Sequence, residues 1–187
     1  MRTEDNSEAL PTFKYHPDPI STGSIERSTQ TCLSCELARG FIYKGLPYAE
    51  NELEDCICPW CIADGTAHQK FNAEFVDAGG IGGYGAWESV SDDIVAEVAF
   101  RTPGFTGWQQ ERWFTHCGDA GAFLGRVGHQ ELLEYGAEAI AAIKAEIGYE
   151  GKDWEDYLES LDKDADPTAY LFRCLHCGAF GGYSDFT

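Results

Sequence analysis

Two Cys-x-x-Cys pairs constrain the fold of this chain more than any other feature of its sequence. They are Cys32 with Cys35 and Cys58 with Cys61, and 22 residues separate the two pairs. Two thiolates at this spacing occupy two corners of a tetrahedral Zn²⁺ site, so two pairs complete a closed site with four cysteine ligands. We therefore expect a zinc-ribbon-like module at about residues 29–65.

The residues between the two pairs are compatible with this module. The separation is slightly longer than the usual roughly 15–20 residues, and it leaves room for a short strand at 40–45, where aromatic and β-branched residues lie between glycines. Two disulfides or a redox-active pair are the alternative interpretations. The first nine residues lack a secretory signal pattern, and no thioredoxin-like βαβ pattern surrounds the cysteines. A cytoplasmic protein with reduced thiols, and hence zinc, is favoured.

A third Cys-x-x-Cys pair, Cys174 with Cys177, lies near the end of the chain and fills only half a site. The adjacent residues His116 and Cys117 are the obvious source of partners. We predict a second Zn²⁺ held by Cys117, Cys174, Cys177 and one further group. That fourth ligand is His116, His176, Asp119 or water. A closed site would be structural, whereas an open one would activate water.

The eight cysteines thus suggest two zinc ions per chain, with one residue left over. The remaining cysteine is Cys56, which lies outside both ligand patterns. We interpret Cys56 as a small hydrophobic side chain in the interior.

Net charge narrows the classes of partner. The 187 residues include 13 basic and 32 acidic side chains, which gives a net charge of −19. Nucleic acid is disfavoured because phosphate contacts need a basic patch, and an anionic membrane surface is disfavoured for the same reason. A basic protein partner would be attracted by such a field, although solubility alone is an alternative explanation.

The periodicity of apolar residues and the positions of glycine and proline predict an α+β protein. We expect a zinc-ribbon-like module packed on a mixed α/β domain. We expect a flexible tail at 1–10 and a single domain at 11–187. A turn is expected at 19–28 and a glycine-rich surface loop at 79–85, whereas 106–114 fits either a strand or a short helix. Helices are predicted at 91–101, at 120–124 with Asp119 as its cap, at 130–147 with Leu133 on its buried face, and from Asp153 onward. Strands are predicted at 169–173 and 181–186, on either side of the third cysteine pair.

The last two predicted helices form a hairpin that carries much of the negative charge. Residues 129–166 contain twelve acids and three lysines, so −9 of the net charge of −19 lies here. A solvated helix face is the simplest explanation. The alternative is a docking surface for a basic partner.

Several longer motifs resemble the CbrC family of small bacterial proteins, over nearly the whole chain from about residue 10. The residues that carry the resemblance are Tyr15-His16-Pro17-Asp18-Pro19, Cys58-Pro59-Trp60-Cys61-Ile62-Ala63-Asp64-Gly65, Arg101-Thr102-Pro103-Gly104-Phe105, Trp108-Gln109-Gln110, His116-Cys117 with Asp119, and Phe172-Arg173-Cys174 with Cys177. The family name is associated with tolerance of a nuclease-type colicin. The resemblance therefore implies a cytoplasmic role in resisting a bacterial toxin, and it transfers no active site.

Three functions remain as hypotheses. The first is a zinc-stabilised protein, without enzymatic activity, that confers toxin tolerance or immunity by masking a basic toxin domain with its acidic surface. The second is a zinc enzyme that uses the site formed by Cys117, Cys174 and Cys177, with a nearby general base. The third is a zinc-ribbon adaptor in a stress response.

Overall fold

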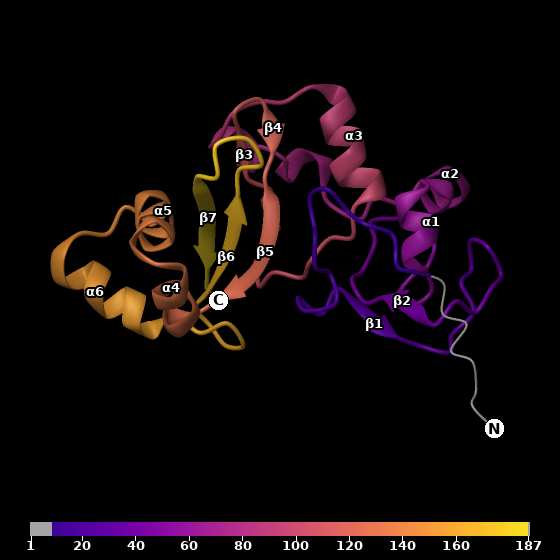
Figure 1. The fold of residues 1–187 in the computed structure, drawn as a ribbon, viewed down its shortest axis with the longest axis horizontal. Coiled ribbons are helices and arrows are strands. Elements are labelled where there is room, and N and C mark those ends of the chain that lie inside the picture. The colour runs from indigo at the N-terminus through magenta and orange to yellow at the C-terminus, as the bar shows by residue number, and fades with distance from the viewer. Residues whose placement is uncertain (1–8, 187) are drawn as a thin grey trace.

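The computed structural model describes residues 9–186 of the chain. Within these residues six α-helices accompany three small antiparallel sheets (Figure 1). The expected α+β class is therefore confirmed. The predicted tail at 1–10 lies almost entirely outside the described residues. None of the helices in the described part is long and apolar enough to cross a membrane.

A three-stranded sheet forms the centre of the molecule. Its strands are β5 (Ala122–Val127), β6 (Thr168–Arg173) and β7 (Phe180–Asp185), all antiparallel, with β6 in the middle. The two strands expected beside the third cysteine pair are confirmed. The helix expected at 120–124 is wrong, because Phe123 pairs with Phe172 and the residues from Ala122 onward form the edge strand β5. Pairing with β6 here outweighs the helix propensity of the Ala-Gly-Ala run.

Strand β6 is buried on both faces, which explains its continuous run of apolar residues. Ala169 and Leu171 pack into a cluster formed with the C-terminal helices. Tyr170 and Phe172 point to the opposite face and join an aromatic cluster that includes Trp113. This alternation follows from the two-residue period of a strand.

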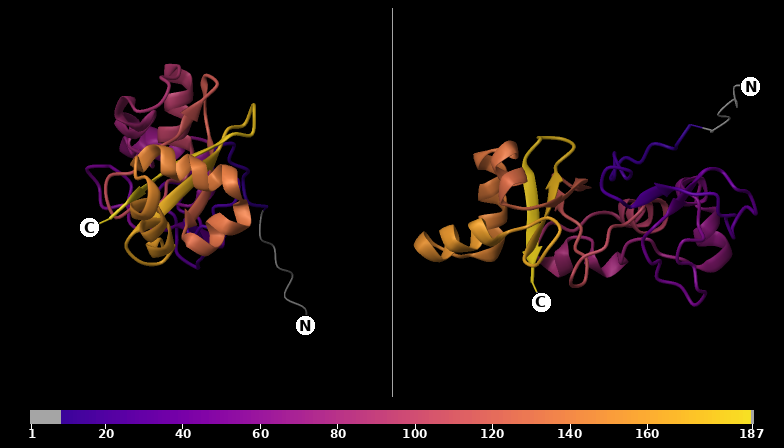
Figure 2. Two further views of the ribbon diagram at one scale, coloured as in Figure 1. Left: turned by 90° about the vertical axis from the view of Figure 1, so that its left-hand side faces the viewer. Right: turned by 90° about the horizontal axis from the view of Figure 1, so that it is seen from below.

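Three helices lie on one side of this sheet, at the opposite end of the molecule from the N-terminal elements (Figures 1 and 2). They are α4 (His129–Tyr135), α5 (Ala137–Ile147) and α6 (Gly151–Ser160). The single helix expected at 130–147 is wrong, because Gly136 has a φ of 93° and separates α4 from α5. The break also turns Leu133 outward, where it is 52% exposed, and Leu132 takes its place in the core.

The N-terminal elements pack around a separate apolar cluster that contains three of the four cysteines of the first two pairs. Strands β1 (Ile25–Arg27) and β2 (Phe41–Tyr43) pair antiparallel, and the short helices α1 (Pro59–Ala63) and α2 (Thr66–Phe71) follow. Strand β2 confirms the expected strand at 40–45. The expectation of only a turn at 19–28 is wrong, because this segment includes strand β1.

The middle of the chain connects the two ends of the molecule. Helix α3 (Asp92–Arg101) confirms the predicted helix, and β3 (Thr115–His116) forms a small hairpin with β4 (Asp119–Ala120). The glycine-rich segment is not the surface loop that was expected. It forms two 3₁₀ turns at Ala78–Gly80 and Gly83–Gly85, and the intervening Ile81 bridges to Trp113. Most of the undecided segment 106–114 is irregular, without helix or paired strand.

The buried side chain of His16 connects segments that are distant in the sequence. Its Nδ1 atom lies 2.6 Å from the carbonyl oxygen of Pro103, and its Nε2 atom lies 2.7 Å from Oγ1 of Thr22. The first contact requires a proton on Nδ1, since a carbonyl only accepts. Burial lowers the pKa of His16 to about 4 despite the Pro103 carbonyl. The neutral ring therefore holds two of the quoted motifs together.

Candidate metal centres

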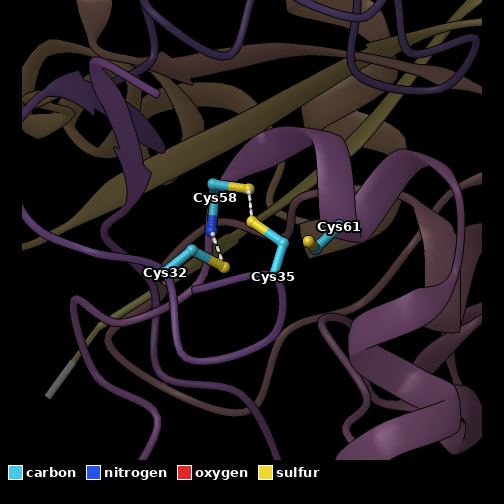
Figure 3. A group of neighbouring side chains, drawn as sticks. All are labelled: Cys32, Cys35, Cys58 and Cys61. Carbon is cyan, nitrogen blue, oxygen red and sulfur yellow. Dashed lines mark hydrogen bonds between the residues drawn. The ribbon is translucent and has the colours of Figure 1, made fainter. Parts of the chain in front are cut away.

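The four cysteines of the first two pairs converge on one point, as Figure 3 shows. Their sulfur atoms all lie within 4.8 Å of one another, and the Sγ atoms of Cys35 and Cys58 are 3.8 Å apart. A tetrahedral site with Zn–S bonds of about 2.3 Å requires sulfur–sulfur separations of about 3.8 Å. This first centre, formed by Cys32, Cys35, Cys58 and Cys61, could therefore hold a metal ion.

The first cysteine pair is held in a tight turn. The carbonyl oxygen of Cys32 accepts from the N–H of Glu36 at 2.8 Å, and the N–H of Cys32 donates to the carbonyl of Leu37 at 3.0 Å. Glu36 has a φ of 60°, the left-handed conformation that closes this turn. The N–H of Ser34 donates to Sγ of Cys32 at 3.4 Å. Such a bond stabilises a thiolate, which is the metal-binding form.

The second pair belongs to a helix start and not to a second turn of the same kind. Cys58 is the residue before α1, Pro59 is its first residue, and Cys61 completes its first turn. Proline favours the first helical position because its missing N–H has no partner there. The N–H of Cys58 also donates to Sγ of Cys32 at 3.3 Å. The module thus combines one turn with one helix start, and the expected zinc ribbon is not shown in this part of the chain.

Burial separates this centre from solvent. Cys32, Cys58 and Cys61 are buried and Cys35 is half-buried. Hydrogen bonds from the thiols of Cys58 and Cys61 lower the pKa of Cys32 strongly. A buried thiolate surrounded by three further thiols is stabilised by a cation at the centre of the group, since an isolated buried charge is costly.

A second group brings together His116, Cys117, Cys174 and Cys177, again with all ligand atoms within 4.8 Å. The Nδ1 atom of His116 lies 3.2 Å from Sγ of Cys117 and 3.4 Å from Sγ of Cys177. A tetrahedral site with these donors requires nitrogen–sulfur separations of about 3.6 Å. This second centre could therefore also hold a metal ion with four protein ligands.

Two hairpin turns supply the ligands of the second centre. In the turn between β3 and β4, Cys117 and Gly118 have φ values of 56° and 72°. Positive φ at both central residues is the requirement of a two-residue type I′ hairpin. The other turn joins β6 to β7 and repeats the hydrogen bonds of the first cysteine turn. The carbonyl of Cys174 accepts from Gly178 at 3.1 Å, and the N–H of Cys174 donates to Ala179 at 2.8 Å.

The second centre is more accessible than the first. Cys117 and Cys177 are exposed and His116 is half-buried, whereas Cys174 is buried. Burial would raise the pKa of the Cys174 thiol. The backbone N–H of Cys177, the His116 ring and the backbone N–H of His176 outweigh burial and bring that pKa down to about 6. The protein thus favours a thiolate at this position.

The other candidates for the fourth ligand contact each other. The Nε2 atom of His176 lies 2.9 Å from Oδ2 of Asp119. Lys14 donates to the same oxygen at 2.8 Å, and the hydroxyl of Tyr15 donates to Oδ1 at 2.6 Å. Burial opposes the charge on Asp119, but the bonds from Lys14, Tyr15 and His176 lower its pKa to about 2. The ionised Asp119 therefore ties the N-terminal segment to the turn that carries Cys174 and Cys177.

Sequence reasoning missed the part of Lys14 and Tyr15 in this network. The available signal was the motif that begins at Tyr15, but no pattern connects it to a residue one hundred positions away. Cys56 stays outside both groups, as expected, although it is half-buried and not fully buried. Its carbonyl accepts from the N–H of Leu33 and so supports the first cysteine turn.

Comparison with known proteins gives the family. The family model described as "Uncharacterised protein family (UPF0167)" matches residues 10–186. The chain belongs to the UPF0167 family. UPF0167 proteins of Mycobacterium bovis and Mycobacterium tuberculosis are each 48% identical over the whole of both chains. A UPF0167 protein of Pseudomonas aeruginosa is 44% identical over 95% of this chain and 98% of its own. No solved structure matches the chain.

UPF0167 is the family of CbrC-like proteins, so the resemblance drawn from the motifs is confirmed at the level of the family. The names of the relatives describe no activity, ligand or partner. Membership therefore supports the shared fold and leaves function to the site and the surface.

Proposed function

We propose that this UPF0167 protein is a cytoplasmic, zinc-stabilised binding protein with one Zn²⁺ in each centre. The first centre offers four sulfur donors, and the second offers three sulfurs and one imidazole nitrogen. Sulfur-rich sets of four protein ligands are typical of structural zinc. Because metal binding contributes directly to folding, each ion would stabilise the segments whose cysteines it joins.

The acidic helical layer supports a role in binding a basic protein. Ten of the twelve acids in residues 129–166 are exposed. They are Glu134, Glu138, Glu150, Asp153, Glu155, Asp156, Glu159, Asp162, Asp164 and Asp166. The helices that carry most of them form one end of the molecule, with nothing of the described chain packed outside them (Figure 2). This concentration of exposed carboxylates is the single observation that carries the proposal.

A nuclease-type toxin domain is the partner that fits this surface and the resemblance to CbrC-like proteins. Such a domain needs basic residues to hold phosphates. An acidic layer presents carboxylates where those phosphates would bind, and it accelerates the encounter at low salt. Binding would mask the toxin and give the cell tolerance or immunity.

The zinc-enzyme alternative receives less support from the second centre. A catalytic zinc keeps one position open for water or substrate. Here four protein side chains converge, so a bound ion would have a complete coordination sphere. The adaptor alternative would use the first centre, but that centre lies within an apolar cluster.

Association kinetics test the proposal. The probe is the isolated basic nuclease domain of a colicin, and the test variant carries Glu155→Lys and Glu159→Lys on α6. The matched control carries Glu50→Lys and Glu52→Lys, two exposed acids of the N-terminal part. Both variants change the net charge equally. We expect the α6 variant to associate at least about 10-fold more slowly and the control within about 3-fold of the parent, with rates that fall steeply as salt rises. Association rates that change neither with salt nor with the α6 charges would contradict the proposal that these helices form the docking surface.

A further inference from the structure

A cavity of about 220 Å³ lies between the N-terminal cluster and the aromatic cluster of the central sheet. Five aromatic side chains line it, together with one charged group, the carboxylate of Glu111. The aromatic residues are Tyr43, Tyr48, Phe75, Phe105 and Trp113. No lysine, arginine or histidine contributes to the lining. A cavity of about 150 Å³ is large enough for benzene, so this one accommodates a small organic molecule.

Glu111 makes the cavity negative on one side. It is half-buried, and its Oε2 atom accepts a hydrogen bond of 2.7 Å from the hydroxyl of Tyr48. Within residues 9–186 the carboxylate forms no ion pair with a basic side chain, and its Oε1 atom accepts no hydrogen bond. The Oε1 atom of Glu111 is therefore available to an ion pair with a cation bound in the cavity.

The neighbouring hydroxyls add no second negative charge to the cavity. Burial, followed by the negative charge of Glu111, raises the pKa of Tyr43, and burial with the hydrogen bond to Glu111 raises that of Tyr48. Both side chains remain neutral donors. The Nε2 group of Gln110 donates to the Tyr48 hydroxyl at 2.8 Å and fixes the orientation of that ring.

The rings are fixed by their own packing. Phe105 stacks on Phe123, with centroids 4.0 Å apart, and lies 5.7 Å from Trp113. Tyr43 meets Phe75 edge to face at 5.5 Å. The negative faces of aromatic rings attract cations, most strongly where the cation has lost its water. Aromatic rings that surround a cavity are a known arrangement for binding quaternary ammonium groups.

We propose that this cavity binds a small organic ammonium ion, with the cationic nitrogen beside Glu111 and its alkyl groups against the rings. The site is distinct from both metal centres and from the acidic helical layer. It therefore does not depend on the partner proposed above. The high net negative charge of the chain would favour entry of a cation over entry of an anion.

Two probes of equal shape separate charge from size. Choline carries a trimethylammonium group, and 3,3-dimethylbutan-1-ol replaces its nitrogen with carbon. The zinc-loaded full chain is titrated with each at about 0.5 M salt, where interactions with exposed charges are screened. We expect choline to bind with a dissociation constant of about 1 mM or below and the neutral analogue at least about 10-fold more weakly. The methyl protons of choline should shift upfield because they lie over ring faces.

Glu111→Gln should weaken choline binding at least about 10-fold and leave the neutral analogue unchanged. Glu134→Gln removes one exposed acid elsewhere and should leave both probes unchanged. A glutamine can still accept the Tyr48 hydrogen bond, and thermal unfolding would check that the variant folds. Equal binding of the two probes, choline binding that survives Glu111→Gln, or no binding of either probe would each overturn the proposal.

Discussion

The Nε2 atom of His176 and the Oδ2 atom of Asp119 lie 2.9 Å apart, outside the group formed by His116, Cys117, Cys174 and Cys177. Two of the groups considered as a fourth ligand therefore bind each other, and His116 is the one that lies with the three cysteines. Asp119 gathers His176, Lys14 and Tyr15 around one carboxylate. The network links both hairpin turns of the second centre to the start of the described chain.

This arrangement predicts different effects for the two histidines. His116→Ala should lower the affinity of the second centre for Zn²⁺ by at least about 100-fold, because it removes a ligand. His176→Ala should lower it by only about 10-fold, the low end of the roughly 10–100-fold that loss of an outer partner typically costs, because its ring contacts Asp119. Competition with a chromophoric chelator measures both affinities. A greater loss for His176→Ala would contradict the assignment.

The first centre offers a matched pair of cysteines. Cys58→Ser should reduce the zinc content from two ions to one and lower the free energy of unfolding by about 3 kcal/mol or more, because the ion contributes to folding. Cys56→Ser, two residues away and outside the group, should keep both ions and change the free energy of unfolding by about 1 kcal/mol or less. Metal analysis and thermal unfolding distinguish the two, and unchanged zinc content in Cys58→Ser would exclude the four-cysteine site.

The buried ring of His16 predicts a loss of stability in mild acid. The unfolded chain takes up a proton near pH 6.5, whereas the native ring stays neutral until about pH 4. The unfolded state therefore binds more protons between these values, and stability falls as pH falls. The contribution between pH 7.5 and 5.5 is about 1.3 kcal/mol. Urea unfolding of the parent and of His16→Gln at several pH values isolates the contribution of His16. Only the parent should lose this contribution of about 1.3 kcal/mol between pH 7.5 and 5.5. Parallel pH profiles would refute the role of His16.

The half-buried ion pair of Arg112 should contribute more to stability than an exposed ion pair. Its Nη2 atom lies 2.6 Å from Glu146 on α5, and its guanidinium lies 4.3 Å from the ring centre of Tyr183. Arg112→Ala should lower the free energy of unfolding by about 1–2 kcal/mol, because packing and charge are both lost. Lys152→Ala breaks the exposed pair with Asp156 and should change it by about 0.5 kcal/mol or less. Equal effects in denaturant titrations would show that Arg112 contributes no more than a surface charge.

Local sequence patterns predicted some features of the structure. The spacing of Cys32, Cys35, Cys58 and Cys61 predicted one group, and the apolar run before Cys174 predicted β6. Helix α3 begins after Ser91 and ends before Pro103, as its acids and proline indicate. Each signal is a short stretch of sequence: a Cys-x-x-Cys pair, an apolar run, or acids after a serine.

The remaining features depend on contacts between distant residues. The segment 120–124 has helical composition, and only its pairing with β6 makes it a strand. The break at Gly136 moves Leu132 inward in place of Leu133, which an uninterrupted 3.6-residue period cannot reveal. His116 lies with the three cysteines only because two hairpin turns distant in the sequence pack side by side, and local patterns cannot distinguish it from His176 or Asp119.

Native mass spectrometry of freshly purified protein, combined with a count of reactive thiols, tests the central claim most directly. Two zinc-binding centres predict two Zn²⁺ ions per chain and about one reactive thiol, that of Cys56, before chelation. Removal of the metal should expose all eight thiols. A chain with no metal and oxidised cysteines would contradict both centres, and a chain with a single ion would contradict the second.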